Sequence, residues 1–431
     1  YGIGAYGKDL ACGIVYTFLM IYFTDVVGIN PAFVGTLFLM ARLWDAINDP
    51  IMGMIVDNTR SRFGKFRPWI FILFLLFRKP DLEGTSLYLY YSVMYILWGM
   101  TYTIMDIPYW SMIPTLATTK EDREKISVVP RIFASLGGLT VTTFGIALVN
   151  KLGNGNQIKG FEYFALGIVI IFIISTIVTC INVKEKTQVQ VNNEKVNIKQ
   201  AFNILKQNDQ LLVFIGIVLA YNLAMQLAGG AAIYYFKYVA GKESLFSLYS
   251  FFKVAEIGGL MLFPVVTRKI GRQQVFRMAT ILPMFGLITL FISGLIAPQS
   301  ILFISVSAVL LNLGSGFLLG STTVMLADIV DYGEYKLGSR NESIIFSAQT
   351  LLVKLASALS GWLIGVGLSL IGYVAGAAVQ SNITIIGIRV IMTIIPSIVA
   401  LVMYVIYKSK YKINGSFHDE ILQVIGSRKK V

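Results

Sequence analysis

The sequence has little charge, almost no histidine and only two cysteines. Charged residues make up 14% of its 431 residues, hydrophobic residues make up 56%, and the mean hydropathy is +0.71. The single histidine, His418, lies in the polar C-terminal segment, which excludes a histidine proton relay inside a membrane. Cys12 and Cys180 lie in separate apolar segments, so we expect neither a disulfide framework nor a cysteine metal site.

Common enzymatic and nucleotide-binding motifs are also missing. No Gly-Lys-Ser/Thr phosphate loop occurs, which argues against direct ATP-driven chemistry. No Ser/His or Cys/His set suited to intramembrane hydrolysis occurs either. The net charge of +13 comes from short basic loops between apolar segments, unlike the basic patch of a nucleic-acid-binding domain. These absences argue against an enzyme, and we expect no cofactor.

Long apolar segments dominate the chain. About 20 apolar residues are needed for a helix to cross a bilayer, and the sequence predicts an all-α membrane protein of twelve transmembrane helices. The tenth residue of segment 68–77 is followed by charge, so this segment is too short to cross. We expect a missing stretch there, with a re-entrant segment as the alternative. The expected spans are 3–28, 31–57, 68–77, 86–115, 130–150, 161–183, 211–238, 246–267, 275–297, 300–328, 343–372 and 382–407.

Basic residues fall mainly in alternate loops, which predicts the orientation of the spans. Loop 57–67 carries four, whereas the opposite loops at 29–30 and 373–382 carry none. Because positive loops stay on the cytoplasmic side, we expect both termini to be cytoplasmic. The expected organisation is two six-helix bundles related by a pseudo-two-fold axis, joined by a polar linker where a cytoplasmic regulatory protein could bind. The boundaries are 1–183 for the first bundle, 184–210 for the linker, 211–407 for the second bundle and 408–431 for a cytoplasmic tail.

One polar run interrupts the second apolar segment. Asp45 and Asp49 are four residues apart, so a helix places them on one face, with Asn48 beside them. Two carboxylates in a low-dielectric medium need a compensating positive charge. A bound cation such as Na⁺ is favoured because it prefers oxygen ligands. The alternative is a structural ion pair with Arg42.

Further charges lie at membrane depth in both halves. Because an unpaired charge costs roughly 3 kcal/mol at the bilayer centre, these groups should converge on one another or on water. We interpret them as lining a central binding cavity; the alternative is that they only fasten helices together. The residues concerned are Lys8, Asp9, Asp106, Arg131 and Lys354.

The fourth apolar segment resembles a sugar-binding surface. Tyr102, Asp106 and Trp110 recur every four residues and lie close to one helix face. A carboxylate accepts hydrogen bonds from sugar hydroxyls, and an aromatic ring packs on the apolar face of the sugar. Interfacial anchoring by the aromatic residues is the alternative. Gln349, Thr350 and Lys354 could form an opposite wall.

Four stretches resemble one family of transporters. They are Tyr1–Asp9, Ala41–Gly53, Tyr95–Pro108 and Asp331–Glu334, and residues 53–65 resemble the signature loop of the major facilitator superfamily. Over residues 1–412 the sequence is similar to the glycoside-pentoside-hexuronide:cation symporters of that superfamily.

The resemblance implies a fold, a location and residue roles. The fold would be the major facilitator fold in a bacterial plasma membrane. The cation site, for Na⁺, Li⁺ or H⁺, would comprise Asp45, Asn48, Asp49 and Thr103, with Asp45 and Asp49 as the carboxylates that hold Na⁺. The sugar site would comprise Lys8, Asp9, Tyr102, Asp106, Trp110, Arg131, Gln349, Thr350 and Lys354. The cytoplasmic gate would contain Asp328, Asp331 and Arg340.

The activity implied is symport of a galactoside, melibiose above all, with a monovalent cation. One departure concerns the second-half wall, where Leu319 stands at the place of a family tryptophan and removes a stacking surface. Symport of a glucuronide, a xyloside or lactose is therefore the nearest alternative. A sodium-dependent lipid carrier on the same fold and a passive channel are the more distant ones.

Overall fold

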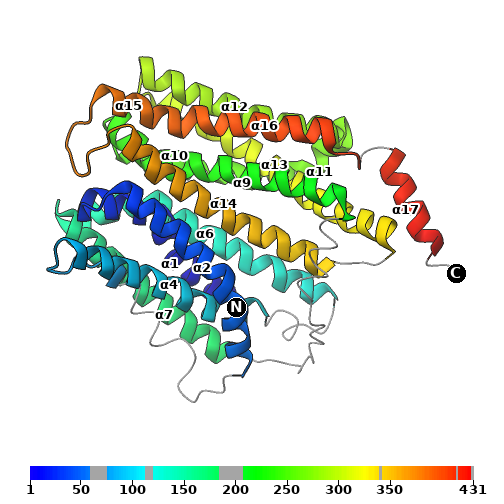
Figure 1. Cartoon of the computed structure of the whole chain (residues 1–431), viewed down its shortest axis with the longest axis horizontal. Helices are drawn as coiled ribbons and strands as arrows, with labels where there is room; N and C mark the ends of the chain where they lie inside the picture. Colours follow the sequence, from blue (N-terminus) through cyan, green and yellow to red (C-terminus); the bar gives the residue numbers. More distant parts are fainter. Residues whose placement is uncertain (59–74, 112–119, 184–206, 339–341, 414–415, 429–431) are drawn as a thin grey trace. The chain divides into compact units, whose positions relative to one another are not determined.

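The computed structural model describes residues 1–58, 75–111, 120–183, 207–338, 342–413 and 416–428. Every regular element in these ranges is a helix (Figure 1). Some helical side chains are outside the description, among them those of Asn48, Asp49, Trp110 and Thr350. Most of the short third span, 68–77, and the gate residue Arg340 also lie outside it.

The chain divides into two compact units. Unit 1 consists of residues 1–192, 243–251 and 361–384, and unit 2 of residues 193–242, 252–360 and 385–431. Besides the end of α14, unit 1 holds α1 (Gly2–Ile21), η1 (Tyr22–Val27), α2 (Pro31–Asn58), α4 (Thr85–Ser111), α6 (Lys120–Gly153), α7 (Gln157–Asn182) and α10 (Ser244–Phe251).

Unit 2 contains the longer helices of the second half. Figure 1 shows α9, α11, α12, α13 and α16 running side by side, and packing contacts join α12 to α13, α11 to α13 and α16 to α9. Its elements are α9 (Asp209–Tyr234), η2 (Tyr235–Val239), α11 (Val254–Ile270), α12 (Arg272–Ile296), α13 (Ile301–Leu337), most of α14 (Glu342–Leu370), most of α15 (Asn382–Arg389), η3 (Val390–Ile394), α16 (Ile395–Lys410) and α17 (Ser416–Arg428).

The expected membrane helices are present. Nine helical segments in the described part of the chain are long and apolar enough to span a bilayer. The charged helices α2 and α4, of 28 and 27 residues, cover the expected second and fourth spans. The all-α prediction is confirmed.

The tenth span is longer than predicted. We expected it to end at 328, but α13 continues to Leu337, so Asp328 and Asp331 lie inside a helix. No helix-breaking residue occurs between these aspartates and Gly338, which terminates α13 with a φ of 72°. Glycine adopts this left-handed conformation without steric penalty, which is why the helix ends there and not at the first acidic residue.

Small residues let the helices of unit 1 approach closely. Helix α1 packs between α6 and α7. A Cβ on Gly7 would collide with Ser175 of α7, and one on Gly137 of α6 would lie 2.7 Å from the Tyr6 carbonyl oxygen. Glycine at helix crossings is typical of membrane bundles, because tight packing replaces the hydrophobic driving force there. This packing fixes the α1 face that carries the polar residues.

Candidate functional site

Lys8 is the centre of a polar cluster in unit 1. Its side chain is buried, and Nζ lies 2.5 Å from Oδ1 of Asp106 and 3.9 Å from Oδ2 of Asp9. Tyr102 donates a hydrogen bond of 3.1 Å to the same Asp106 oxygen. Helices α1 and α4 therefore bring together four of the residues predicted to bind sugar.

Asp9 has an unused acceptor. Its Oδ2 atom is shielded from solvent, and no donor among the described residues makes a hydrogen bond to it. The ion-pair distance of 3.9 Å to Lys8 is too long for one. A buried carboxylate oxygen without a donor is costly, and the hydroxyl of a ligand would satisfy it.

Aromatic rings surround this cluster. Tyr102 stacks on Trp98 with ring centroids 5.7 Å apart, and Tyr1 stacks on Tyr109 at 4.5 Å. The Lys8 ammonium lies 5.3 Å from the centre of the Tyr109 ring. We did not predict Trp98 or Tyr109 as site residues, although Trp98 precedes Tyr102 by one helical turn and so extends the same stripe. The side chain of Trp110 lies outside the described residues.

Arg131 remains available for a ligand. It is exposed on α6, and no described residue pairs or hydrogen-bonds with it. Six residues further on, Gly137 crosses α1 where a Cβ would lie 3.3 Å from the Asp9 Cβ. Six residues of helix span about 9 Å, a distance comparable to the length of a disaccharide. The prediction that Arg131 contacts sugar stays a prediction.

Asp45 is buried in α2 and paired with an arginine. Arg42 Nη1 lies 3.0 Å from Asp45 Oδ2, one helical turn away, and the Arg42 guanidinium lies 5.2 Å from the Tyr16 ring centre. The structural ion pair that we held as the alternative to a cation site is thus present. It supplies the positive charge that a buried carboxylate requires.

The same carboxylate faces α4. A Cβ on Gly99 would lie 3.1 Å from Asp45 Oδ1, so the glycine leaves room for the oxygen. Thr103 lies one turn along α4, and its hydroxyl donates to the Gly99 carbonyl at 3.2 Å. The structure therefore groups Asp45 with the α4 turn that carries Thr103. The side chains of Asn48 and Asp49, the other predicted cation ligands, lie outside the described residues.

The predicted second-half residues belong to unit 2. Gln349 and Lys354 lie half-buried on α14, five residues apart, while the side chain of Thr350 is outside the description. Leu319 is half-buried on α13. Their role as a wall of the sugar site stays a prediction.

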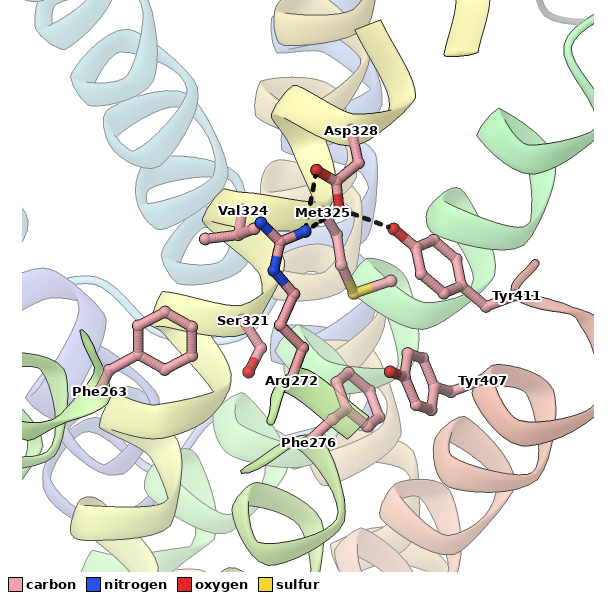
Figure 2. Close-up of a pocket in the computed structure, with 9 residues that line it drawn as sticks. All are labelled: Phe263, Arg272, Phe276, Ser321, Val324, Met325, Asp328, Tyr407 and Tyr411. Carbon is pink, nitrogen blue, oxygen red and sulfur yellow. Dashed lines mark hydrogen bonds and ion pairs between the residues drawn. The ribbon is translucent and has the colours of Figure 1, made fainter. Parts of the chain in front are cut away.

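The predicted gate residue Asp328 is the centre of a second polar cluster, in unit 2 (Figure 2). Arg272, at the start of α12, donates from Nη1 to both carboxylate oxygens at 3.3 and 3.1 Å. Tyr411 donates to Oδ2 at 3.3 Å, and Nε2 of His418 lies 3.2 Å from Oδ1. We did not predict that His418 belongs to this cluster, and these partners all come from unit 2.

Burial and electrostatics support a stable cluster around Asp328. The Asp328 side chain is 7% exposed, which excludes the alternative that it is a solvated loop charge. Burial and the neighbouring Asp328 carboxylate raise the pKa of Tyr411 far above its usual value, so Tyr411 is a hydrogen-bond donor at every physiological pH. Asp331 is half-buried one turn away, and the other predicted gate residue, Arg340, is not described.

A third group of contacts ties the start of α9 to the end of α13. Asp209 Oδ1 accepts a hydrogen bond of 2.8 Å from Tyr332 and forms an ion pair of 2.5 Å with Lys336. Gln210 accepts from the backbone N–H of Lys412 at 2.8 Å. The chain after α16 is therefore fixed to α9, which positions α17 beside α13.

The Asp328 cluster gives a testable prediction. We expect Arg272→Gln to lower the midpoint of thermal unfolding, because it leaves a buried carboxylate without its strongest partner, at a cost of about 3 kcal/mol. His418→Ala should leave this midpoint nearly unchanged but increase hydrogen exchange in α17, because the imidazole is a link between α17 and α13. The control is Arg268→Gln, an exposed charge near the same end of α11. Unchanged exchange in α17 would contradict the role of His418.

Unit 1 also contains a contact that we did not predict. Tyr373 donates a hydrogen bond to Asp25 of η1, and the Ser369 hydroxyl accepts from the Ala32 N–H at 3.1 Å. Beside them, a Cβ on Gly365 would lie 2.3 Å from the Pro31 carbonyl oxygen. The start of α2 and the end of α14 are thus tightly joined, at the end of α2 remote from Asp45. Glycine-rich spacing in 361–365 was the available signal in the sequence.

A sequence-family model decides the identity of the fold. The model described as "MFS/sugar transport protein" matches residues 1–415, which is nearly the whole chain. The chain belongs to this family. Its major facilitator fold is therefore shown, in agreement with the resemblance found in the sequence.

Relatives of this MFS sugar transport protein are transporters. It is 31% identical to the "Isoprimeverose transporter" of Lactiplantibacillus pentosus over 88% of this chain and 81% of the relative. It is 28% identical to the "Lactose permease" of Lactobacillus delbrueckii subsp. bulgaricus over 98% of this chain and 71% of the relative. It is also 28% identical to the "Putative glycoside/cation symporter YagG" of Escherichia coli (strain K12) over 96% of this chain and 91% of the relative.

Solved structures agree on the fold. The crystal structure titled "A Bacterial Homolog to Human Lysosomal Transporter, Spinster, in Inward-facing And Unoccupied Conformation" superposes with a TM-score of 0.71. It covers 96% of this chain and 97% of its own, at 13% identity. At this identity the likeness concerns the fold alone.

Proposed function

We propose that this protein is a secondary active transporter that couples the uptake of a galactoside, such as melibiose, to a monovalent cation. The observation that carries the proposal is the shielded Oδ2 of Asp9, which no described donor satisfies, beside the Lys8–Asp106–Tyr102 network. Membership of the sugar transport family and the names of the relatives support sugar–cation symport.

The cluster has the chemistry that a sugar needs. Asp9 offers acceptors for hydroxyl groups, Lys8 holds a donor between two carboxylates, and the rings of Tyr102 and Tyr109 offer apolar faces. Charge-assisted hydrogen bonds of this kind are about twice as strong as neutral ones. A neutral glycoside fits because Asp106 already neutralises Lys8, so no ligand charge is required.

Helix α4 connects the two proposed sites. Gly99 and Thr103 face Asp45, whereas Tyr102 and Asp106 face Lys8. A Na⁺ ion at Asp45 and Asp49 would replace the Arg42 guanidinium as a counter-charge and order this turn of α4. Because coupling between two sites is reciprocal, sugar would tighten cation binding by the same factor.

Alternating access would then move both ligands across the membrane. In the carriers built from repeated bundles, the bundles rock around a central site. We place Asp328, Asp331 and Arg340 at the cytoplasmic gate and assign the Asp25–Tyr373 contact to the opposite end. A cytoplasmic regulatory partner at 184–210 remains part of the proposal, and 184–206 lies outside the described residues.

A xyloside is the second candidate substrate. The relative named "Isoprimeverose transporter" is 31% identical, and Leu319 provides a smaller side chain than tryptophan on the second-half wall. The glucuronide and lactose alternatives differ only in the sugar. A lipid carrier is disfavoured because the Lys8 cluster is charged and polar.

Uptake into right-side-out vesicles tests the proposal. We expect labelled melibiose to accumulate when a sodium gradient is imposed and to equilibrate when it is absent, with saturation at carrier-like rates. Unlabelled xylosides, lactose and glucuronides as competitors rank the substrates. No stimulation by sodium, lithium or a pH gradient for any of these sugars would overturn cation-coupled glycoside transport.

A further inference from the structure

Arg389 is a buried cation that the proposed transport mechanism does not use. It ends α15, and the residue is 8% exposed. Its Nε atom is shielded and has no hydrogen-bond partner among the described residues. The contact that the structure does show is with a ring, since the guanidinium lies 5.9 Å from the centre of Phe291.

The surroundings of Arg389 are tightly built. A Cβ on Gly294 of α12 would lie 3.0 Å from Arg389 Nε and 2.7 Å from the Tyr235 hydroxyl oxygen, so glycine is needed for this approach. Tyr235 itself donates to the Leu290 carbonyl at 2.7 Å, so its hydroxyl hydrogen is already engaged. The segment η3, which follows Arg389 directly, packs against both α9 and α12.

No anion of the neighbouring helix ends is positioned to neutralise this charge. The last turns of α9–η2 and α12 and all of α15, which the structure describes in full, contain no carboxylate, and the nearby charges Lys237 and Lys242 are positive. Two helix C-termini, at Val239 and Ile296, supply only partial negative charge. A full counter-charge would therefore come from outside the protein.

An apolar stripe leads to the same place. Exposed side chains recur on α12 at intervals of three and four residues, which places them on one face of the helix. The stripe ends next to Gly294 in the chain and therefore near Arg389. Its members are Phe285, Ile288, Ile292 and Leu295.

We propose that Arg389 binds the phosphate of an anionic phospholipid whose acyl chain lies along this stripe of α12. A phosphate accepts charge-assisted hydrogen bonds from a guanidinium, and the lipid chain covers apolar side chains that water would not. The depth is suitable, because α12 ends two residues after Gly294, at the membrane surface opposite the Asp328 cluster. Arginine at this surface is otherwise disfavoured by the distribution of positive charge in membrane proteins.

Full-length protein in phosphatidylcholine nanodiscs with graded phosphatidylglycerol tests this site. We expect phosphatidylglycerol to raise the midpoint of thermal unfolding. Arg389→Gln should increase the lipid fraction needed for half the effect by roughly fivefold, the equivalent of about 1 kcal/mol for one basic residue. Lys242→Gln, which removes an exposed charge at the same end, should not change it.

Three outcomes overturn the site. The same dependence on phosphatidylglycerol in wild type and Arg389→Gln would show that Arg389 binds no lipid. An equal rise with inorganic phosphate in pure phosphatidylcholine would assign Arg389 to a free anion. If Arg389→Gln fails to fold, Gly294→Ala keeps the charge but displaces Nε, and an unchanged dependence in that variant would also contradict the proposal. Sugar uptake is not the readout, so this test is independent of the proposed function.

Discussion

Asp9→Asn should abolish high-affinity sugar binding while the protein stays folded. The substitution keeps the shape of the side chain but replaces a charged acceptor with a neutral amide. Because a hydrogen bond to a charged group contributes about 1.5–3 kcal/mol, we expect affinity to fall roughly 10- to 100-fold. Lys8 keeps Asp106 at 2.5 Å as its partner, so the fold should be little affected.

The measurement is displacement of a fluorescent galactoside from membrane vesicles. Asp81→Asn, which alters an exposed carboxylate of unit 1 remote in sequence from the cluster, is the matched control. The melting midpoint of each variant shows whether the protein is folded. Wild-type affinity in a folded Asp9→Asn protein would remove Asp9 from the sugar site.

Asp45→Asn should abolish accumulation of sugar on a sodium gradient. Two effects are mixed in this variant, because Arg42, whose side chain is 10% exposed, also loses its charged partner. Leaving one member of a buried pair costs about 3–5 kcal/mol, so stability should fall as well. The double variant Arg42→Gln/Asp45→Asn removes both charges, and it should regain thermal stability without regaining cation-driven accumulation.

This comparison separates an ion pair from a cation site. If Asp45 serves only Arg42, the double variant will concentrate sugar like the wild type, and the cation proposal fails at this residue. Asp49→Cys provides the companion measurement, because it should abolish coupling to sodium while retaining sugar binding. Accumulation on a sodium gradient by Asp49→Cys would remove Asp49 from the site.

The local pattern of the sequence was sufficient for the helices and for much of the first-half cluster. Long apolar runs predict membrane helices because each backbone group must be satisfied within its own segment in a bilayer. The spacing of Tyr102 and Asp106 predicts a shared face because helical periodicity is fixed, and the structure joins the two by a hydrogen bond. Lys8 and Asp9 were predictable as charges that must be compensated at membrane depth.

Only the tertiary structure decided which partner each charge has. The sequence allowed Asp45 a cation or Arg42, and geometry shows Arg42 at 3.0 Å. It placed His418 in a polar tail, whereas the fold brings this residue back to Asp328, far earlier in the chain. Nothing in the sequence around Arg389 indicates which helix ends surround it. Long-range contacts depend on how helices cross, and the glycines that permit the crossings at Gly99, Gly137 and Gly294 carry no mark of their partners until the chain has packed.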